Sequence, residues 1–157
     1  MNKITNSHPD NSYTVEGALS AKENGDLKNW VIKLLLSEES YELAEKIESE
    51  KYVSIEMLLF PLSLLKKIQG PEENVTHRQP AHVWEGKVKN LADMLTDGYS
   101  PAPLIVTDFW NHFEIADGNH RHEALVRMGT KNYWTIFFIK HEEGRKYLLD
   151  VMKTDSV

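Results

Sequence analysis

The chain of 157 residues carries 41% apolar residues, no cysteine and a formal net charge of −6. This length suffices for one domain with a buried core, and the lack of cysteine excludes disulfides, thiolate metal sites and cysteine catalysis. The negative charge disfavours broad attraction to nucleic acid, and the sequence contains neither a run of about 18 apolar residues nor an apolar core of signal-peptide type, so we expect a cytoplasmic protein with no membrane segment.

The N-terminal part of the chain divides into an arm and a helical segment. Residues 1–25 are polar and lack hydrophobic periodicity, so we expect a flexible arm there. Residues 26–51 are predicted to form an extension of two helices. The first helix is capped by Asp26, and its apolar residues recur at the spacing of one helical face. The second helix is predicted to begin at Ser37, because acidic residues in its first turn favour the helix dipole.

A strand, a polar loop and a helix are predicted next. Residues 52–55 are rich in β-branched and aromatic side chains and alternate as a strand does, and Pro61 must end whatever precedes it. The stretch "GPEENVTHRQPAH", residues 70–82, is a polar loop that contains two prolines. Apolar residues from Trp84 onward recur at helical spacing and end at the Asp-Gly pair 97–98.

The C-terminal half predicts a small sheet. Residues 103–116 indicate two strands joined by a tight turn near Asn111, which is a hairpin. Residues 133–139, "YWTIFFI", form a continuous apolar run of strand length, which is typical of a strand buried on both faces. Residues 141–157 are predicted as a short polar helix or tail. The fold class is therefore α+β, a mixed α/β arrangement with helices ahead of a small mixed sheet.

The stretch "IADGNHRHEALVRMG", Ile115 to Gly129, gathers hydrogen-bond donors where a strand turns into a helix. The Asp-Gly pair 117–118 marks the turn, and Gly129 marks the end of the helix. The first amides of a helix have no internal partners and the macrodipole makes that end positive, while His120 and Arg121 add side-chain donors. These parts predict an anion site, most simply a phosphate site.

Two other interpretations of this stretch remain open. An Asp-Gly-Asn turn before a helix is ordinary, and Asn119 is a good N-cap in any protein. Alternatively, His112, His120 and His122 could hold a metal ion, although residues 120 and 122 of one helix point to different faces. No G-x-S-x-G motif supports a serine nucleophile.

Residues 52–140 resemble the ParB/sulfiredoxin superfamily in the order and spacing of their parts. These parts are "YVSIEMLL", "THRQPAH", "EGKVKNLADML", "PAPLIV", "HFEIA", "DGNHRHEALVRMG" and "YWTIFFI". The resemblance implies a small mixed sheet flanked by helices, with the two N-terminal helices as additions. It also implies a purine nucleoside di- or triphosphate (ATP or ADP) with magnesium as cofactor, with Gly118, Asn119, His120 and Arg121 as the phosphate cradle and Lys87 as an assisting lysine.

Two departures separate the chain from parts of the superfamily, and one similarity connects it to another part. Sulfiredoxin has a cysteine where this chain has Asn119, so its sulfinic-acid chemistry is excluded. ParB proteins append a helix-turn-helix region, for which residues 141–157 are too short. The motif "DGNHR" is similar to the corresponding motif of the free-serine kinase branch. That similarity implies Asp117 as a catalytic carboxylate or magnesium ligand, with Glu72 and Glu73 as candidate bases; Arg78, in the same loop, is a further candidate phosphate donor.

Three function classes follow. The first is a nucleotide-dependent phosphotransferase acting on a small hydroxyl-bearing substrate. The second is a nucleotide-binding regulatory module without chemistry. The third is a ParB-like nucleic-acid-binding or nuclease protein, which the acidic charge balance disfavours, and we expect no tight binding to duplex DNA.

Overall fold

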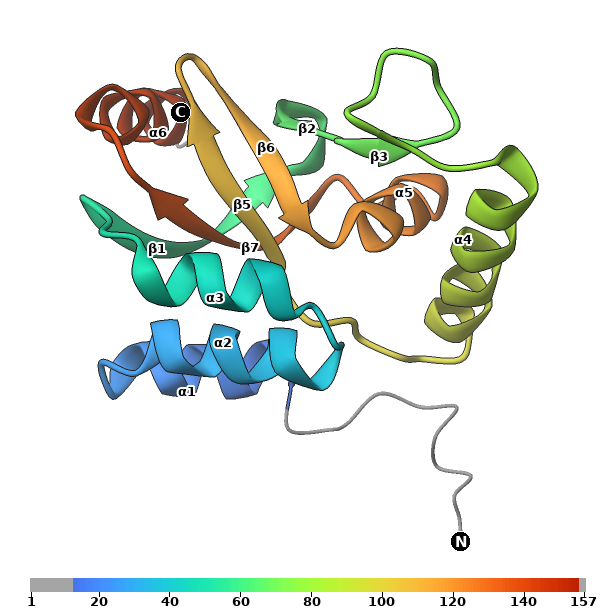
Figure 1. Ribbon diagram of the computed structural model, residues 1–157, viewed down its shortest axis with the longest axis horizontal. Coiled ribbons are helices and arrows are strands. Elements are labelled where there is room, and N and C mark those ends of the chain that lie inside the picture. Colours follow the sequence, from blue (N-terminus) through green and yellow to red (C-terminus); the bar gives the residue numbers. More distant parts are fainter. Residues whose placement is uncertain (1–12, 156–157) are drawn as a thin grey trace, which may run out of the picture. The chain divides into compact units, whose positions relative to one another are not determined.

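The computed structural model of the chain describes residues 13–155, and they divide into two compact units. The first unit contains the residues up to Ser49 together with Ser100–Ala102, and the second contains Glu50–Tyr99 and the chain from Pro103 onward. Both are drawn in Figure 1. Among the described residues, no helix is long and apolar enough to cross a membrane.

The first unit is built from three helices. They are α1 (Val15–Glu23), α2 (Leu27–Ser37) and α3 (Tyr41–Ser49). The Thr14 hydroxyl caps α1 by accepting a hydrogen bond from the Gly17 N–H at 2.9 Å. Apolar side chains from all three helices are buried, among them Ala18, Val31, Leu34, Leu35 and Ile47.

Two sequence predictions for this region are wrong. The expected flexible arm contains α1, because three small apolar residues, Val15, Ala18 and Ala21, share one helix face and are buried. The remainder of that predicted arm, residues 1–12, lies outside the described residues. The helix predicted from Ser37 begins at Tyr41 instead. α2 continues through Ser37, and Glu39 then adopts a φ of +62° that separates the two helices.

The second unit contains a five-stranded mixed sheet in the order β1-β7-β5-β6-β2. Its strands are β1 (Ser54–Pro61), β2 (Leu65–Lys66), β5 (Leu104–Phe109), β6 (His112–Asp117) and β7 (Asn132–Ile139). β7 pairs antiparallel with β1 and parallel with β5, and β5 and β6 form the predicted hairpin. β2 adds two residues, parallel to β6. The mixed α/β fold class predicted from the sequence is confirmed.

Aromatic packing fills the core of this sheet. The rings of Phe60 and Phe113 both meet that of Phe137 edge to face, with centroids 4.9 and 5.0 Å apart. Leu125 and Leu148, from two of the helices, belong to the same buried cluster. Residues 135–139 of β7 are all fully buried, so the prediction of a strand buried on both faces over residues 133–139 is confirmed for these five, whereas Tyr133 and Trp134 are half-buried.

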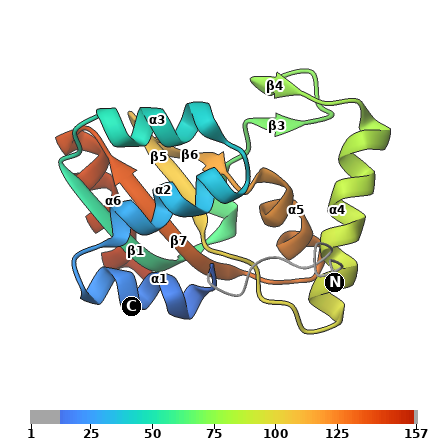
Figure 2. The same cartoon turned by 60° about the horizontal axis from the view of Figure 1, so that its bottom comes forward.

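Helices and two short strands complete the second unit. These are the 3₁₀ turn η2 (Leu62–Leu64), β3 (Gln69–Gly70), β4 (His77–Arg78), α4 (Ala81–Thr96), α5 (Asn119–Arg127) and α6 (Glu142–Asp155). The first strand, predicted over residues 52–55, runs instead from Ser54 to Pro61. β3 and β4 pair parallel within the stretch predicted as a polar loop. α4 and α5 lie side by side next to this pair, as Figure 2 shows, with Trp84 and Val88 packed on Ala124.

Candidate anion site at the start of α5

Gly118 joins β6 to α5 and is the N-cap residue of the helix. Its φ of +106° lies in the left-handed region that favours glycine, and a Cβ there would stand 2.8 Å from Leu104 Cδ2. The glycine is therefore required by the chain's own packing. It also leaves the start of α5 without a side-chain cap, so the positive end of the helix dipole keeps its first amides available.

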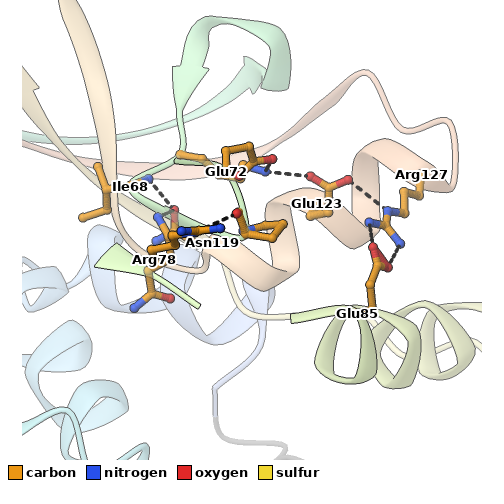
Figure 3. Close-up of polar contacts among 10 residues, drawn as sticks. Ile68, Glu72, Arg78, Glu85, Asn119, Glu123 and Arg127 are labelled. Atoms are coloured by element: carbon orange, nitrogen blue, oxygen red, sulfur yellow. Dashed lines mark hydrogen bonds and ion pairs between the residues drawn. The ribbon is translucent and has the colours of Figure 1, made fainter. Parts of the chain in front are cut away.

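The Asn119 side chain points away from this helix start. It is only 3% exposed, and its Oδ1 accepts hydrogen bonds from the Ile68 N–H at 2.8 Å and the Gln69 N–H at 3.3 Å (Figure 3). Its Nδ2 donates to the Ile115 carbonyl at 3.2 Å. The side chain thus links β3 to α5 by hydrogen bonds. It is not the N-cap that one interpretation of the sequence predicted. Only the backbone amide of Asn119 is left for the predicted phosphate cradle.

The His120 side chain joins α5 to the other end of the β3–β4 segment. Its Nε2 lies 3.1 Å from Gln79 Oε1, and its ring lies against Trp84 with centroids 4.6 Å apart. Burial, followed by the positive charges of Lys87 and Arg121, lowers the pKa of His120 to about 4. The ring is therefore neutral at pH 7, and the Asp117 carboxylate partly offsets the effect of the two cations.

Arg121 and Asp117 form an ion pair beside Gly118. Arg121 Nη2 lies 3.1 Å from Asp117 Oδ2, and the same nitrogen donates to the Pro103 carbonyl at 3.1 Å. The two side chains are 11% and 18% exposed. The pair holds the guanidinium at the start of the helix and shares its charge with a carboxylate.

The remaining predicted residues lie on two sides of the helix start. Lys87 is exposed on α4 and forms no ion pair within residues 13–155, although its charge reaches His120. Arg78 is exposed on β4, and its Nε donates to the Pro71 carbonyl at 3.1 Å. Glu72 and Glu73 follow β3. Glu72 forms an ion pair, whereas Glu73 is exposed and has none among the described residues.

The partner of Glu72 belongs to a charged cluster that the sequence analysis missed. We call it the Lys67 cluster, and its members are Lys67, Glu72, Glu85, Glu123 and Arg127. Lys67 Nζ lies 3.0 Å from Glu72 and 3.3 Å from Glu123, and it also stands 4.9 Å above the Trp84 ring. Arg127 binds Glu123 at 2.9 Å and Glu85 at 2.7 Å (Figure 3).

Part of this cluster could have been found from the sequence. Glu123 and Arg127 are four apart on one predicted helix, which is the spacing of an intrahelical ion pair. No local pattern connects Lys67 with Glu123 or Arg127 with Glu85, because those contacts join distant segments.

The histidines of the alternative metal interpretation do not converge. His112 pairs with Glu114 at 3.1 Å, and His122 Nε2 bonds to the Leu62 carbonyl at 2.8 Å, whereas His120 faces Gln79. In the described part of the chain, no group of three or more His, Asp or Glu side chains is arranged to hold a metal ion.

Comparisons with known proteins give a likeness in fold. No protein-family model and no curated protein sequence matches the chain. A solved structure of C-terminally truncated SbnI from Staphylococcus aureus is 18% identical with a TM-score of 0.39, and the match covers 55% of this chain. The chain spans only 31% of the length of that SbnI structure.

Sulfiredoxin from Arabidopsis thaliana is a second similar structure. It is 22% identical with a TM-score of 0.37, and the match covers 59% of this chain and 97% of that chain. At these TM-scores the likeness says nothing about what the chain binds.

Proposed function

We propose that the start of α5 binds a phosphate-bearing ligand, most simply ATP or ADP with magnesium. The observation that carries the proposal is an uncapped helix N-terminus with the Arg121 guanidinium held beside it. Gly118 provides no cap, and Lys87 and Arg121 together help to depress the pKa of the neutral His120. Helix amides and positive charge are the two features that phosphate sites at helix termini share.

Each predicted residue has a distinct part in this proposal. The backbone amides of Asn119 and His120 donate to phosphate oxygens, and the exposed Lys87 adds a mobile positive charge. Arg121 contributes its charge from the ion pair with Asp117. Arg78 lies on β4, whose end is joined to the helix by the Gln79–His120 hydrogen bond, so it is the outermost cation of the proposed site.

Transfer of a phosphoryl group to a small hydroxyl compound is a second candidate function, favoured by the position of Asp117. This carboxylate directly precedes the glycine of the helix start and lies 3.1 Å from Arg121, and it is the group proposed to hold magnesium or orient a hydroxyl. Phosphoryl transfer depends mainly on such positioning and charge stabilisation. Glu73 is the better candidate base of the two loop glutamates, because Glu72 is bound to Lys67.

A pair of lysine variants on α4 tests ligand binding. We expect Lys87→Ala to weaken MgADP or MgATP binding about fivefold, since an exposed charge contributes about 1 kcal/mol to a phosphate contact. Lys89→Ala is the matched control, because Lys89 is on the same helix, is 77% exposed and pairs with Asp93 instead. Isothermal titration calorimetry measures both. Equal affinity for the two variants, or no binding by the unmodified protein, would contradict the proposal.

A further inference from the structure

Glu72 occupies a small anion-binding cradle made by its own loop. One carboxylate oxygen accepts a hydrogen bond from Lys67, and the other lies against Gly70, where a Cβ would force the flexible Glu72 side chain to shift. Hydrogen bonds from its own backbone amide and from Lys67 outweigh the effect of burial and lower the pKa of Glu72. Gly70 and Lys67 therefore form a receptor for an anionic oxygen.

The charges of the Lys67 cluster indicate that Glu72 is the carboxylate that can be displaced from the cluster. The cluster contains three carboxylates and two cations. Without Glu72, Lys67 and Arg127 remain to balance Glu123 and Glu85, and the cluster is neutral. Glu123 and Glu85 are on helices and bind Arg127, whereas Glu72 is on the loop after β3 and pairs with Lys67.

Lys67 keeps its position without Glu72. Its ammonium group stands over the Trp84 ring at 4.9 Å and is 3.3 Å from Glu123, and its side chain is only 18% exposed. A cation over an indole ring is attracted by the ring's electrons. The lysine is thus pre-positioned to accept another anion.

The cradle lies next to the proposed phosphate site. Ile68, the neighbour of Lys67, donates its amide to Asn119, the first residue of α5. Trp84 contacts both Lys67 and His120. Glu123, which contacts Lys67, is four residues after Asn119 on α5, about 6 Å along the helix axis.

We propose that Lys67 is a further phosphate-binding residue and that Glu72 is its resting counter-ion, which a bound phosphate displaces. The inference rests on the proposed function, because it extends the same site. No bond forms or breaks. A phosphate oxygen replaces a carboxylate oxygen on Lys67 and beside Gly70, and the Glu72 side chain is released from Lys67. Glu72 therefore competes with the ligand from within the chain.

Calorimetric titration with MgADP and with inorganic pyrophosphate tests the exchange. We expect Glu72→Gln to bind at least about threefold more tightly than the unmodified protein, since the internal competitor loses its charge. Lys67→Met should bind at least about tenfold more weakly, and Lys67→Arg should stay within about threefold of the unmodified protein. Asp97→Asn is the control for a general charge effect, because Asp97 is exposed at the end of α4 without an ion pair among the described residues.

The outcomes separate this inference from the proposed function. Tighter binding by Glu72→Gln together with unchanged binding by Asp97→Asn supports the exchange. If Lys87→Ala weakens binding but Glu72→Gln does not strengthen it, the exchange is wrong and the phosphate site stands. If the unmodified protein binds neither probe, both proposals are wrong. Glu72→Gln leaves Lys67 in place, so this arm decides the question even if Lys67→Met fails to fold.

Discussion

The Asn119 side chain accepts a hydrogen bond from the backbone amide of Ile68 at 2.8 Å, and this contact joins the first residue of α5 to β3. Asn119 is 3% exposed, and both ends of its amide group are bonded. Because removal of the side chain leaves the Ile68 amide and the Ile115 carbonyl without these partners, we expect Asn119→Ala to lower the free energy of unfolding by about 2 kcal/mol. Urea denaturation measures the change.

Asn90→Ala is the control for that variant, since Asn90 is exposed on α4. We expect it to change the free energy of unfolding by less than about 0.5 kcal/mol. A similarly small effect of Asn119→Ala would show that the hydrogen bonds between Asn119 and the β3 segment add nothing to stability.

Alanine substitutions at two glycines are expected to change the free energy of unfolding in opposite directions. Gly118→Ala forces a left-handed φ on a side chain that also meets Leu104, so we expect a loss of at least about 2 kcal/mol in the free energy of unfolding. Gly86 is within α4, and a Cβ there meets nothing within 4 Å. Gly86→Ala should therefore gain about 0.5–1 kcal/mol from helix propensity. Thermal denaturation of both variants checks the signs, and a stabilised Gly118→Ala would refute the backbone argument.

The lowered pKa of His120 predicts a loss of stability in acid. The folded protein binds the proton at His120 only near pH 4, whereas the unfolded chain binds it near the ordinary value of 6.5. The unfolded state therefore holds more protons between these values, and stability falls as the pH drops from 6.5 towards 4. In His120→Gln, which cannot titrate, this part of the fall should be missing.

Denaturation midpoints of the two proteins across pH 4–7 measure that difference. Burial is also the main cause of the lowered pKa of His122. A smaller loss of stability in acid therefore remains in His120→Gln. An NMR titration of His120 with a midpoint near 6.5 would contradict the prediction directly.

Asp117→Asn separates binding from chemistry. If Asp117 holds magnesium or orients an acceptor hydroxyl, the substitution should lower the rate of nucleotide consumption far more than it changes nucleotide affinity, because phosphoryl transfer depends on charge placed in the transition state. The assay measures consumption of ATP or ADP with a panel of small hydroxyl compounds, free serine among them. Equal rates for the variant and the unmodified protein would place the chemistry elsewhere, with Glu73 as the next candidate.

The local parts of the fold were predictable from the sequence. The hairpin turn near Asn111, the helix start after Gly118 and the left-handed residue Gly129 all follow from short-range chemistry. α1 was missed because its buried face consists of small residues, Val15 and two alanines, which give a weak periodic signal. Helix patterns are easiest to recognise when the buried side chains are large.

The candidate site was predictable only in part. The motif correctly indicated a helix start with Arg121 beside it, but it could not show that the Asn119 side chain turns inward to meet Ile68. That direction depends on a segment about fifty residues earlier in the chain. The contacts of Lys67 could not be predicted for the same reason, since an ion pair between Lys67 and Glu123 produces no local pattern in the sequence.

The position of β7 has a consequence for synthesis. β7 lies between β1 and β5 in the sheet, yet it is the last strand in the chain. Emerging from a ribosome, β1 and the β5–β6 hairpin must wait for residues 132–139 before β7 can join them. Sheet assembly is therefore a late event that depends on contacts between distant parts of the chain, which slow folding. A chain interrupted before Asn132 carries strands whose hydrogen-bonding edges have no strand to join them, which exposes it to aggregation.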